Sequence, residues 1–113
     1  MNEYRIRITR QANENLKAIR NYIQFELHAP IAARNTIASI KAVIQSLIYL
    51  PERIHLTPEQ PWHDSGVRRI RVKNYYIYFW IDECNKMVQI ISVIYVKREQ
   101  NRYLQDFSNT DLI

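Results

Sequence analysis

The sequence predicts an α+β fold: an N-terminal strand, an antiparallel helical hairpin and then a three-stranded antiparallel meander, with the hairpin packed on one face of the sheet. Two observations lead to this expectation. The chain has 113 residues and is 47% hydrophobic, which suits a single domain over residues 1–113 with its own core. Its apolar residues first alternate with a period of two, then recur at helical spacing, and finally alternate again.

The chain opens with a predicted strand over residues 3–8, where Tyr4, Ile6 and Ile8 alternate with polar side chains. Thr9 follows as a helix N-cap, because its hydroxyl can accept a hydrogen bond from a free N–H of the first turn. The first helix is expected to run to about His28. Its apolar stripe consists of Ala12, Leu16, Ile19, Ile23 and Leu27.

A second helix is expected from Pro30 to Pro51. Proline suits the first turn of a helix, since its missing N–H has no partner there, and it ends a helix elsewhere. Because only about two residues separate the helices, the chain must turn back on itself as an antiparallel hairpin. The buried face of the second helix is predicted to hold Ile37, Ile40, Ile44, Leu47 and Ile48.

The second half of the chain reads as a loop followed by strands. Residues 52–65 contain two prolines and no sustained period, which predicts a long surface loop. Strands are expected over 67–73, 76–82 and 87–95, with a tight turn at Asn74 and Tyr75. The last strand is apolar on both faces apart from Gln89 and Ser92, as a central strand would be.

The sheet face turned away from the helices is the first candidate site. It is expected to interleave cations with aromatic rings, contributed by Arg5, Arg7, Arg69, Arg71, Lys73, Tyr76, Tyr78 and Trp80. Cations neutralise phosphates and flat rings stack on unpaired bases, so such a surface suits single-stranded RNA. The alternative is that a partner protein or a C-terminal segment covers the aromatic residues. Residues 66–104 carry eight of the sixteen Lys and Arg residues against three acidic ones, which favours a polyanion or an acidic protein as partner.

Composition excludes several classes of function. A single glycine, Gly66, cannot build the glycine-rich loops that cradle nucleotide phosphates. One cysteine, Cys84, allows neither an internal disulfide nor a multi-cysteine zinc site, and His28, His55 and His63 lack metal-ligand spacing. We therefore expect no metal and no small-molecule cofactor. The first residues lack the apolar region of a secretory signal, so a cytoplasmic location without membrane contact is expected.

The order of these segments resembles the RelE/ParE superfamily, the toxins of bacterial type II toxin–antitoxin modules. The first block of similarity, with the spacing of the ParE-like branch, consists of Tyr4, Ile6, Thr9, Ala12, Leu16, Ile19, Tyr22 and Ile23. The expected end of the second helix, Leu47 to Pro51, fits as well. A second block covers RRIRVKNYYIYFWID at 68–82 and IISVIYVKREQNRYL at 90–104.

The resemblance implies a bacterial, cytoplasmic toxin that causes growth arrest, serves plasmid stabilisation and is neutralised by a cognate antitoxin. ParE-like members inhibit DNA gyrase, whereas RelE-like members cleave mRNA on the ribosome without a metal. The nuclease's two strand lysines fall on Arg69 and Arg71, its next arginine on Tyr76 and its final arginine on Arg98. Guanidinium, whose pKa lies far above neutral pH, is a poor base, and Tyr76 cannot replace a positive charge. Because the set of nuclease residues is incomplete, the sequence narrowly favours gyrase inhibition.

Three functions remain open from the sequence. An endoribonuclease would depend on five catalytic residues, Arg69, Arg71, Lys73, Tyr76 and Arg98. Contact with nucleic acid or with a target protein would use Arg5, Arg7, Tyr78, Trp80, Tyr95 and Lys97. A gyrase inhibitor needs no catalytic residue, and the third alternative is a nucleic-acid-binding module without toxicity.

Overall fold

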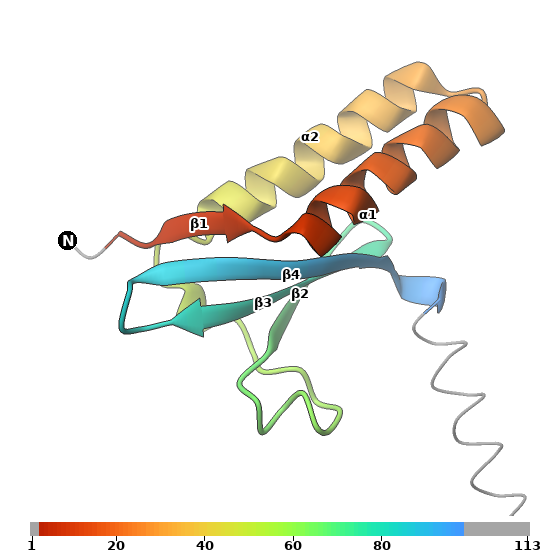
Figure 1. Cartoon of the computed structure of the whole chain (residues 1–113). Helices are drawn as coiled ribbons and strands as arrows, with labels where there is room; N and C mark the ends of the chain where they lie inside the picture. The colour runs from red at the N-terminus through yellow and green to blue at the C-terminus, as the bar shows by residue number, and fades with distance from the viewer. Residues whose placement is uncertain (1–2, 99–113) are drawn as a thin grey trace, which may run out of the picture.

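A helical hairpin lies across one face of a sheet in the computed structural model, which describes residues 3–98 (Figure 1). In chain order the elements are β1 (Arg5–Ile8), α1 (Arg10–Asn21), the π-helix η1 (Tyr22–Glu26), α2 (Pro30–Ser46), the 3₁₀ turn η2 (Pro51–Arg53), β2 (Arg68–Val72), β3 (Tyr75–Asp82) and β4 (Met87–Tyr95). The α+β fold class and the order of elements predicted from the sequence are confirmed.

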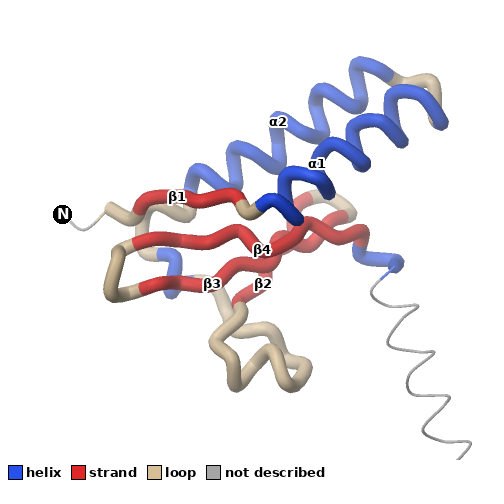
Figure 2. The backbone as a smooth tube through the Cα atoms, in the orientation of Figure 1, coloured by secondary structure: helices blue, strands red, loops and turns tan. Residues whose placement is uncertain are grey.

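The sheet has the strand order β1-β4-β3-β2, as Figure 2 shows. Strands β2, β3 and β4 form the predicted antiparallel meander. Strand β1 pairs with β4 in parallel, from Arg5 opposite Met87 to Ile8 opposite Ile90. β4 lies between β1 and β3, so the central position predicted for this strand is confirmed.

The core lies between the hairpin and the sheet. Its largest fully buried side chains include Phe79, Ile40, Leu47, Ile77 and Ile90. Burial of an aliphatic or aromatic side chain of this size contributes about 1.5–3 kcal/mol to the free energy of unfolding. The predicted buried face is confirmed, since its members are buried or partly buried; Leu47 and Ile48 belong to it but lie just after the end of α2. Packing of this face against the sheet therefore fixes which sheet face stays open.

Thr9 joins β1 to α1 and ties both to β4. Its Oγ1 accepts a hydrogen bond from the Ala12 N–H at 3.2 Å, which confirms the predicted N-cap. The same hydroxyl donates to the carbonyl oxygen of Ile90 at 2.7 Å. The first turn of α1 is thereby fastened to the central strand at the point where β1 ends.

The first helix ends differently from the prediction. After Asn21 the backbone widens into η1, where the N–H of Leu27 bonds to the carbonyl of Tyr22 at 3.1 Å. His28, with a φ of 51°, then stops the helix. The wider turn moves Leu27 off the apolar stripe, so this side chain is exposed and the expectation that it is buried was wrong.

Two further boundaries differ from the prediction. Helix α2 ends at Ser46 rather than near Pro51. The tight turn between β2 and β3 lies at Lys73 and Asn74, one residue earlier than expected, because Tyr75 packs against the core and pairs with Val72. Lys73 therefore lies in the turn, with a φ of 53°, and not on the strand.

Candidate functional site

Side chains that point away from the helices form one surface, which we call the open face. Strand pairing places them in rows across the sheet: Arg7, Gln89 and Trp80; then Arg69, Tyr78 and Ser92; then Arg71, Tyr76 and Ile94. Arg5 precedes the first row on β1. Figure 1 shows both helices on the opposite side of the sheet. Cations and aromatic rings therefore share this face, as the alternation in the sequence predicts.

Arg69 is engaged on several sides within the chain. Its Nη1 lies 3.3 Å from Oε2 of Glu59, and its guanidinium carbon lies 4.2 Å from the centroid of the Tyr76 ring. Burial lowers the pKa of the guanidinium, but a hydrogen bond with Tyr78 and the charge of Glu59 more than offset it, so the pKa is raised overall. The positive charge of Arg69 is thus compensated inside the protein.

The aromatic residues of the open face differ in exposure. The rings of Tyr76 and Tyr78 meet edge to face, with centroids 6.2 Å apart and an interplanar angle of 65°. Tyr78 is only 8% exposed, so the expectation of a bare stacking ring was wrong, because Tyr76 and Arg69 both contact it. Trp80 is 40% exposed, and its indole edge lies next to Gly66. Trp80 is thus more accessible to a partner than Tyr78.

The loop before β2 covers part of the open face. Figure 1 shows this loop, in green, on the side of the sheet opposite the helices. Its start is held by the Thr57 N–H, which donates to the carbonyl of Val67 at 2.8 Å. The loop brings Glu59 to Arg69. Sequence reasoning missed Glu59, because an aperiodic loop gives no register that would place it beside a strand.

Four exposed cations gather where β4 ends: Arg71, Lys73, Lys97 and Arg98. The Nε of Arg71 donates to the carbonyl of Lys73 at 3.0 Å. The N–H of Val96 donates to the carbonyl of Asn74 at 2.8 Å, which holds the β2–β3 turn beside the helical turn that begins after β4. We call this group of cations the basic end.

The other predicted contact residues lie apart from Arg69 and Arg71. Tyr95 does not belong to the open face, because it pairs with Tyr75 and their rings meet on the helix side, with centroids 5.6 Å apart. Arg5 and Arg7 lie on β1, at the opposite edge of the sheet from β2. The structure thus divides the sequence-predicted site into separate groups instead of one cluster.

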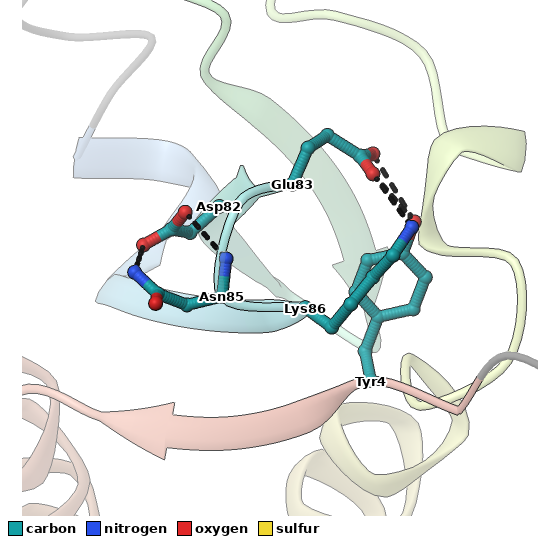
Figure 3. A network of polar contacts seen from close by, with 5 residues as sticks. All are labelled: Tyr4, Asp82, Glu83, Asn85 and Lys86. Carbon is teal, nitrogen blue, oxygen red and sulfur yellow. Dashed lines mark hydrogen bonds and ion pairs between the residues drawn. The ribbon is translucent and has the colours of Figure 1, made fainter.

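A polar network closes the other end of the sheet (Figure 3). The Tyr4 hydroxyl donates to the Glu83 carboxylate at 3.0 Å, and Nζ of Lys86 lies 3.2 Å from the same carboxylate. Burial, the hydrogen bond and the charge of Glu83 raise the pKa of Tyr4. Hydrogen bonds from the side chain and backbone of Asn85 lower the pKa of Asp82. This network fastens the β3–β4 turn to the N-terminal segment.

Residues 3–98 contain neither a cluster of metal ligands nor a membrane-spanning helix. No group of three or more His, Cys, Asp and Glu side chains in this range could hold a metal ion. Within the same range no helix is long and apolar enough to cross a bilayer. The open face itself presents guanidinium, phenol and indole groups, with the ammonium groups of Lys73 and Lys97 at the basic end.

Solved structures of similar fold come from toxin–antitoxin systems. The chromosomal ParDE system from P. aeruginosa has a TM-score of 0.70 and 21% identity, covering 85% of this chain and 99% of that chain. The RelBE2 toxin–antitoxin complex from Mycobacterium tuberculosis has a TM-score of 0.61 and 19% identity, covering 82% and 98%. The archaeal RelE–RelB complex from Pyrococcus horikoshii OT3 has a TM-score of 0.55 and 17% identity, covering 87% and 99%. At these identities the likeness shows the fold.

The sequence itself identifies the family. No curated protein sequence matches the chain significantly. The family described as the ParE toxin of type II toxin–antitoxin system, parDE, matches over residues 6–100. This match covers nearly all of the elements described above. The chain therefore belongs to the ParE toxin family of type II toxin–antitoxin systems.

Proposed function

We propose that this toxin arrests growth by inhibiting DNA gyrase and does not cut mRNA. The main support for this proposal is the set of contacts that Arg69 makes within the chain. This residue stands at one of the strand positions where the resembling nucleases have a lysine, and its guanidinium is paired with Glu59 and stacked on Tyr76. A guanidinium held in this way is a poor acceptor for the proton of a 2′-hydroxyl, which a metal-free nuclease has to remove.

The neighbouring positions support the same proposal. Arg71 is also a guanidinium, and its Nε already donates to the carbonyl of Lys73. Tyr76, at the position of a nuclease arginine, packs its ring against Arg69 and Tyr78. These side chains serve the packing of the open face. The family assignment also disfavours the third alternative, a nucleic-acid-binding module without toxicity.

We further infer that a cognate antitoxin binds this chain. The similar solved structures belong to toxin–antitoxin systems, and two of them are complexes of the two proteins. This chain also exposes large apolar side chains on the helical hairpin, in loops and on strands, among them Trp62 in the loop before β2 and Trp80 on β3. Apolar surface of this kind favours a partner that covers it.

The second candidate is a RelE-like, ribosome-dependent mRNA endoribonuclease, and the basic end favours it. Arg71, Lys73, Lys97 and Arg98 are all exposed and could contact phosphates of a bound strand. Under this alternative Arg98 would neutralise the phosphate at the cleavage site, since it is the residue retained from the nuclease pattern.

Two measurements decide between these functions. Purified toxin is added to a gyrase supercoiling reaction, and mRNA from induced cells is mapped by primer extension. We expect loss of supercoiling and no codon-positioned cuts. The double variant Arg71→Ala/Arg98→Ala, which removes two cations of the basic end, should inhibit gyrase as the native toxin does. Codon-positioned cuts that disappear in Arg98→Ala would overturn the proposal and make the protein an endoribonuclease.

A further inference from the structure

The end of the helical hairpin exposes four large apolar side chains. Tyr22, Phe25, Leu27 and Ile31 are 56%, 62%, 54% and 72% exposed, and we call them the hairpin tip. They come from η1, from the connection after it and from the first turn of α2. Figure 2 shows this end of the hairpin reaching beyond the strands. A soluble protein seldom gathers large apolar side chains at one exposed place unless a partner covers them.

A change in backbone hydrogen bonding creates this surface. In a regular α-helix Leu27 would follow Ile23 on the buried stripe, four residues later. In η1 the Leu27 N–H instead bonds to the carbonyl of Tyr22, and the Ala29 N–H bonds to that of Ile23, each at 3.1 Å. Leu27 is turned outward as a result. Single π-turns of this kind are rare and occur often at functional sites.

The part of the hairpin that carries the hairpin tip has more cations than acids. Residues 17–34 carry Lys17, Arg20 and Arg34, all exposed, against the single acid Glu26. A second copy of this chain would bring like charges together, since its formal net charge is +5. Nucleic acid would satisfy the cations but offers little apolar surface to the side chains between them. The chemistry that fits is a protein groove with apolar walls and an acidic rim.

We propose that the hairpin tip is the surface through which the toxin grips its target enzyme, with Phe25 and Ile31 inserted into an acidic-rimmed apolar groove of DNA gyrase. This inference rests on the proposed function, which names gyrase as the target. Apolar anchors at the centre exclude water and carry most of the affinity of such an interface. Arg20 and Arg34 on the rim act mainly on the rate of association.

The double variant Phe25→Ala/Ile31→Ala tests the anchors. Its matched control is Tyr49→Ala/Leu50→Ala, which removes an aromatic and an aliphatic side chain of similar exposure, 53% and 64%, at the other end of α2. Both variants should keep the native circular dichroism spectrum, because no buried side chain is changed. We expect the tip variant to need about tenfold or more protein for half-inhibition of gyrase supercoiling. The control should inhibit as the native toxin does.

The outcomes separate this inference from the proposed function. Equal inhibition by the tip variant and the native toxin overturns the inference and leaves gyrase as the target. If the native toxin does not inhibit gyrase, the proposed function fails. Growth arrest by the two variants then tests whether the hairpin tip contacts a target. In that case, arrest by the control but not by the tip variant supports the hairpin tip as the contact with another target protein, whereas arrest by both overturns it.

Other occupants of the hairpin tip give distinct results. A tip variant that loses its antitoxin but still arrests growth would assign the surface to the antitoxin and overturn the inference. If the native toxin is a dimer and the tip variant is a monomer that still arrests growth, the hairpin tip would be assigned to contact with a second copy of the chain. The charge reversal Arg20→Glu/Arg34→Glu should slow association with gyrase and reduce its salt dependence. An unchanged association rate would contradict the acidic rim.

Discussion

The Oδ1 of Asn15 on α1 accepts a hydrogen bond at 3.1 Å from the backbone N–H of Val93 on β4. Pairing between β1 and β4 ends where Ile8 faces Ile90. Beyond that point the edge of β4 has α1 as its neighbour, and a side chain of the helix takes the place of a strand. A backbone N–H left without a partner in this part-buried position would destabilise the sheet.

Asn15→Ala should therefore destabilise the protein. The Val93 N–H would lose its acceptor, and the free energy of unfolding should fall by about 1–3 kcal/mol. Urea denaturation followed by circular dichroism measures the change. Asn13→Ala, an exposed position on the same helix, is the control and should leave stability nearly unchanged. Equal stability of the two variants would show that the hydrogen bond contributes nothing.

Glu59→Gln should release the charge of Arg69 on the open face. The exposed ion pair contributes about 1 kcal/mol or less, so stability should change little. Binding of single-stranded RNA should become tighter, and its salt dependence should steepen by roughly 0.7 for one added phosphate contact. Fluorescence anisotropy over a salt series measures this slope. Glu52→Gln serves as the control, and the same slope for both variants would rule out masking of Arg69 by Glu59.

Lys73→Gly should stabilise the β2–β3 turn. Lys73 has a φ of 53°, which costs a residue with a side chain energy that glycine does not incur. We expect a gain of roughly 0.5–1 kcal/mol, seen as a higher melting temperature in calorimetry. Arg71→Gly, on the adjacent strand, should lower it instead. A lower melting temperature for Lys73→Gly would contradict the assigned turn.

Tyr4→Phe should change the response of stability to alkaline pH. Because the pKa of Tyr4 is raised in the folded protein, the protonated hydroxyl stabilises the fold fully below the ordinary value of 10.0. This contribution is lost as the pH rises through the raised pKa. Native toxin should be more stable than the variant at pH 7, and the difference should shrink above pH 10. Lys86 titrates in both proteins. A stability difference between them that stays constant above pH 10 would therefore refute the role of the Tyr4 hydroxyl.

A cognate antitoxin should remain bound in concentrated salt. Its contact is expected to cover apolar side chains, which salt does not weaken. Co-expressed toxin and antitoxin should copurify in about 0.5 M salt, where charges are screened within roughly 4 to 5 Å. Dissociation under this condition would show that charge alone holds the complex.

Local periodicity was sufficient to predict most elements of this fold. The alternation of apolar and polar residues predicted the strands, and the apolar character of β4 predicted its central position. Thr9 was correctly predicted as an N-cap. Periodicity assumes regular hydrogen bonding, so it could not reveal the π-turn that exposes Leu27. It also carries no information on pairing between distant segments, which is why the parallel contact of β1 with β4 was not predicted.

The candidate site was only partly accessible to sequence reasoning. The alternation correctly placed Arg69, Arg71 and Tyr76 on one face of the sheet. It could not show that Glu59, from an aperiodic loop, pairs with Arg69, or that Tyr78 is buried by its neighbours. The hairpin tip was missed for another reason: apolar residues in a helix are expected to face the core, and only the three-dimensional arrangement shows which do not.

The central position of β4 also governs how the toxin is made. Both β1 and β3 need β4 as a neighbour, yet among the strands of residues 3–98 β4 is the last to leave the ribosome. A nascent chain that stops before residue 87 has β1 without any strand to pair with. Contacts so distant in sequence form only after β4 has been synthesised. We therefore expect toxic activity to arise in one step once β4 is available for pairing, while shorter fragments from an interrupted message stay inert.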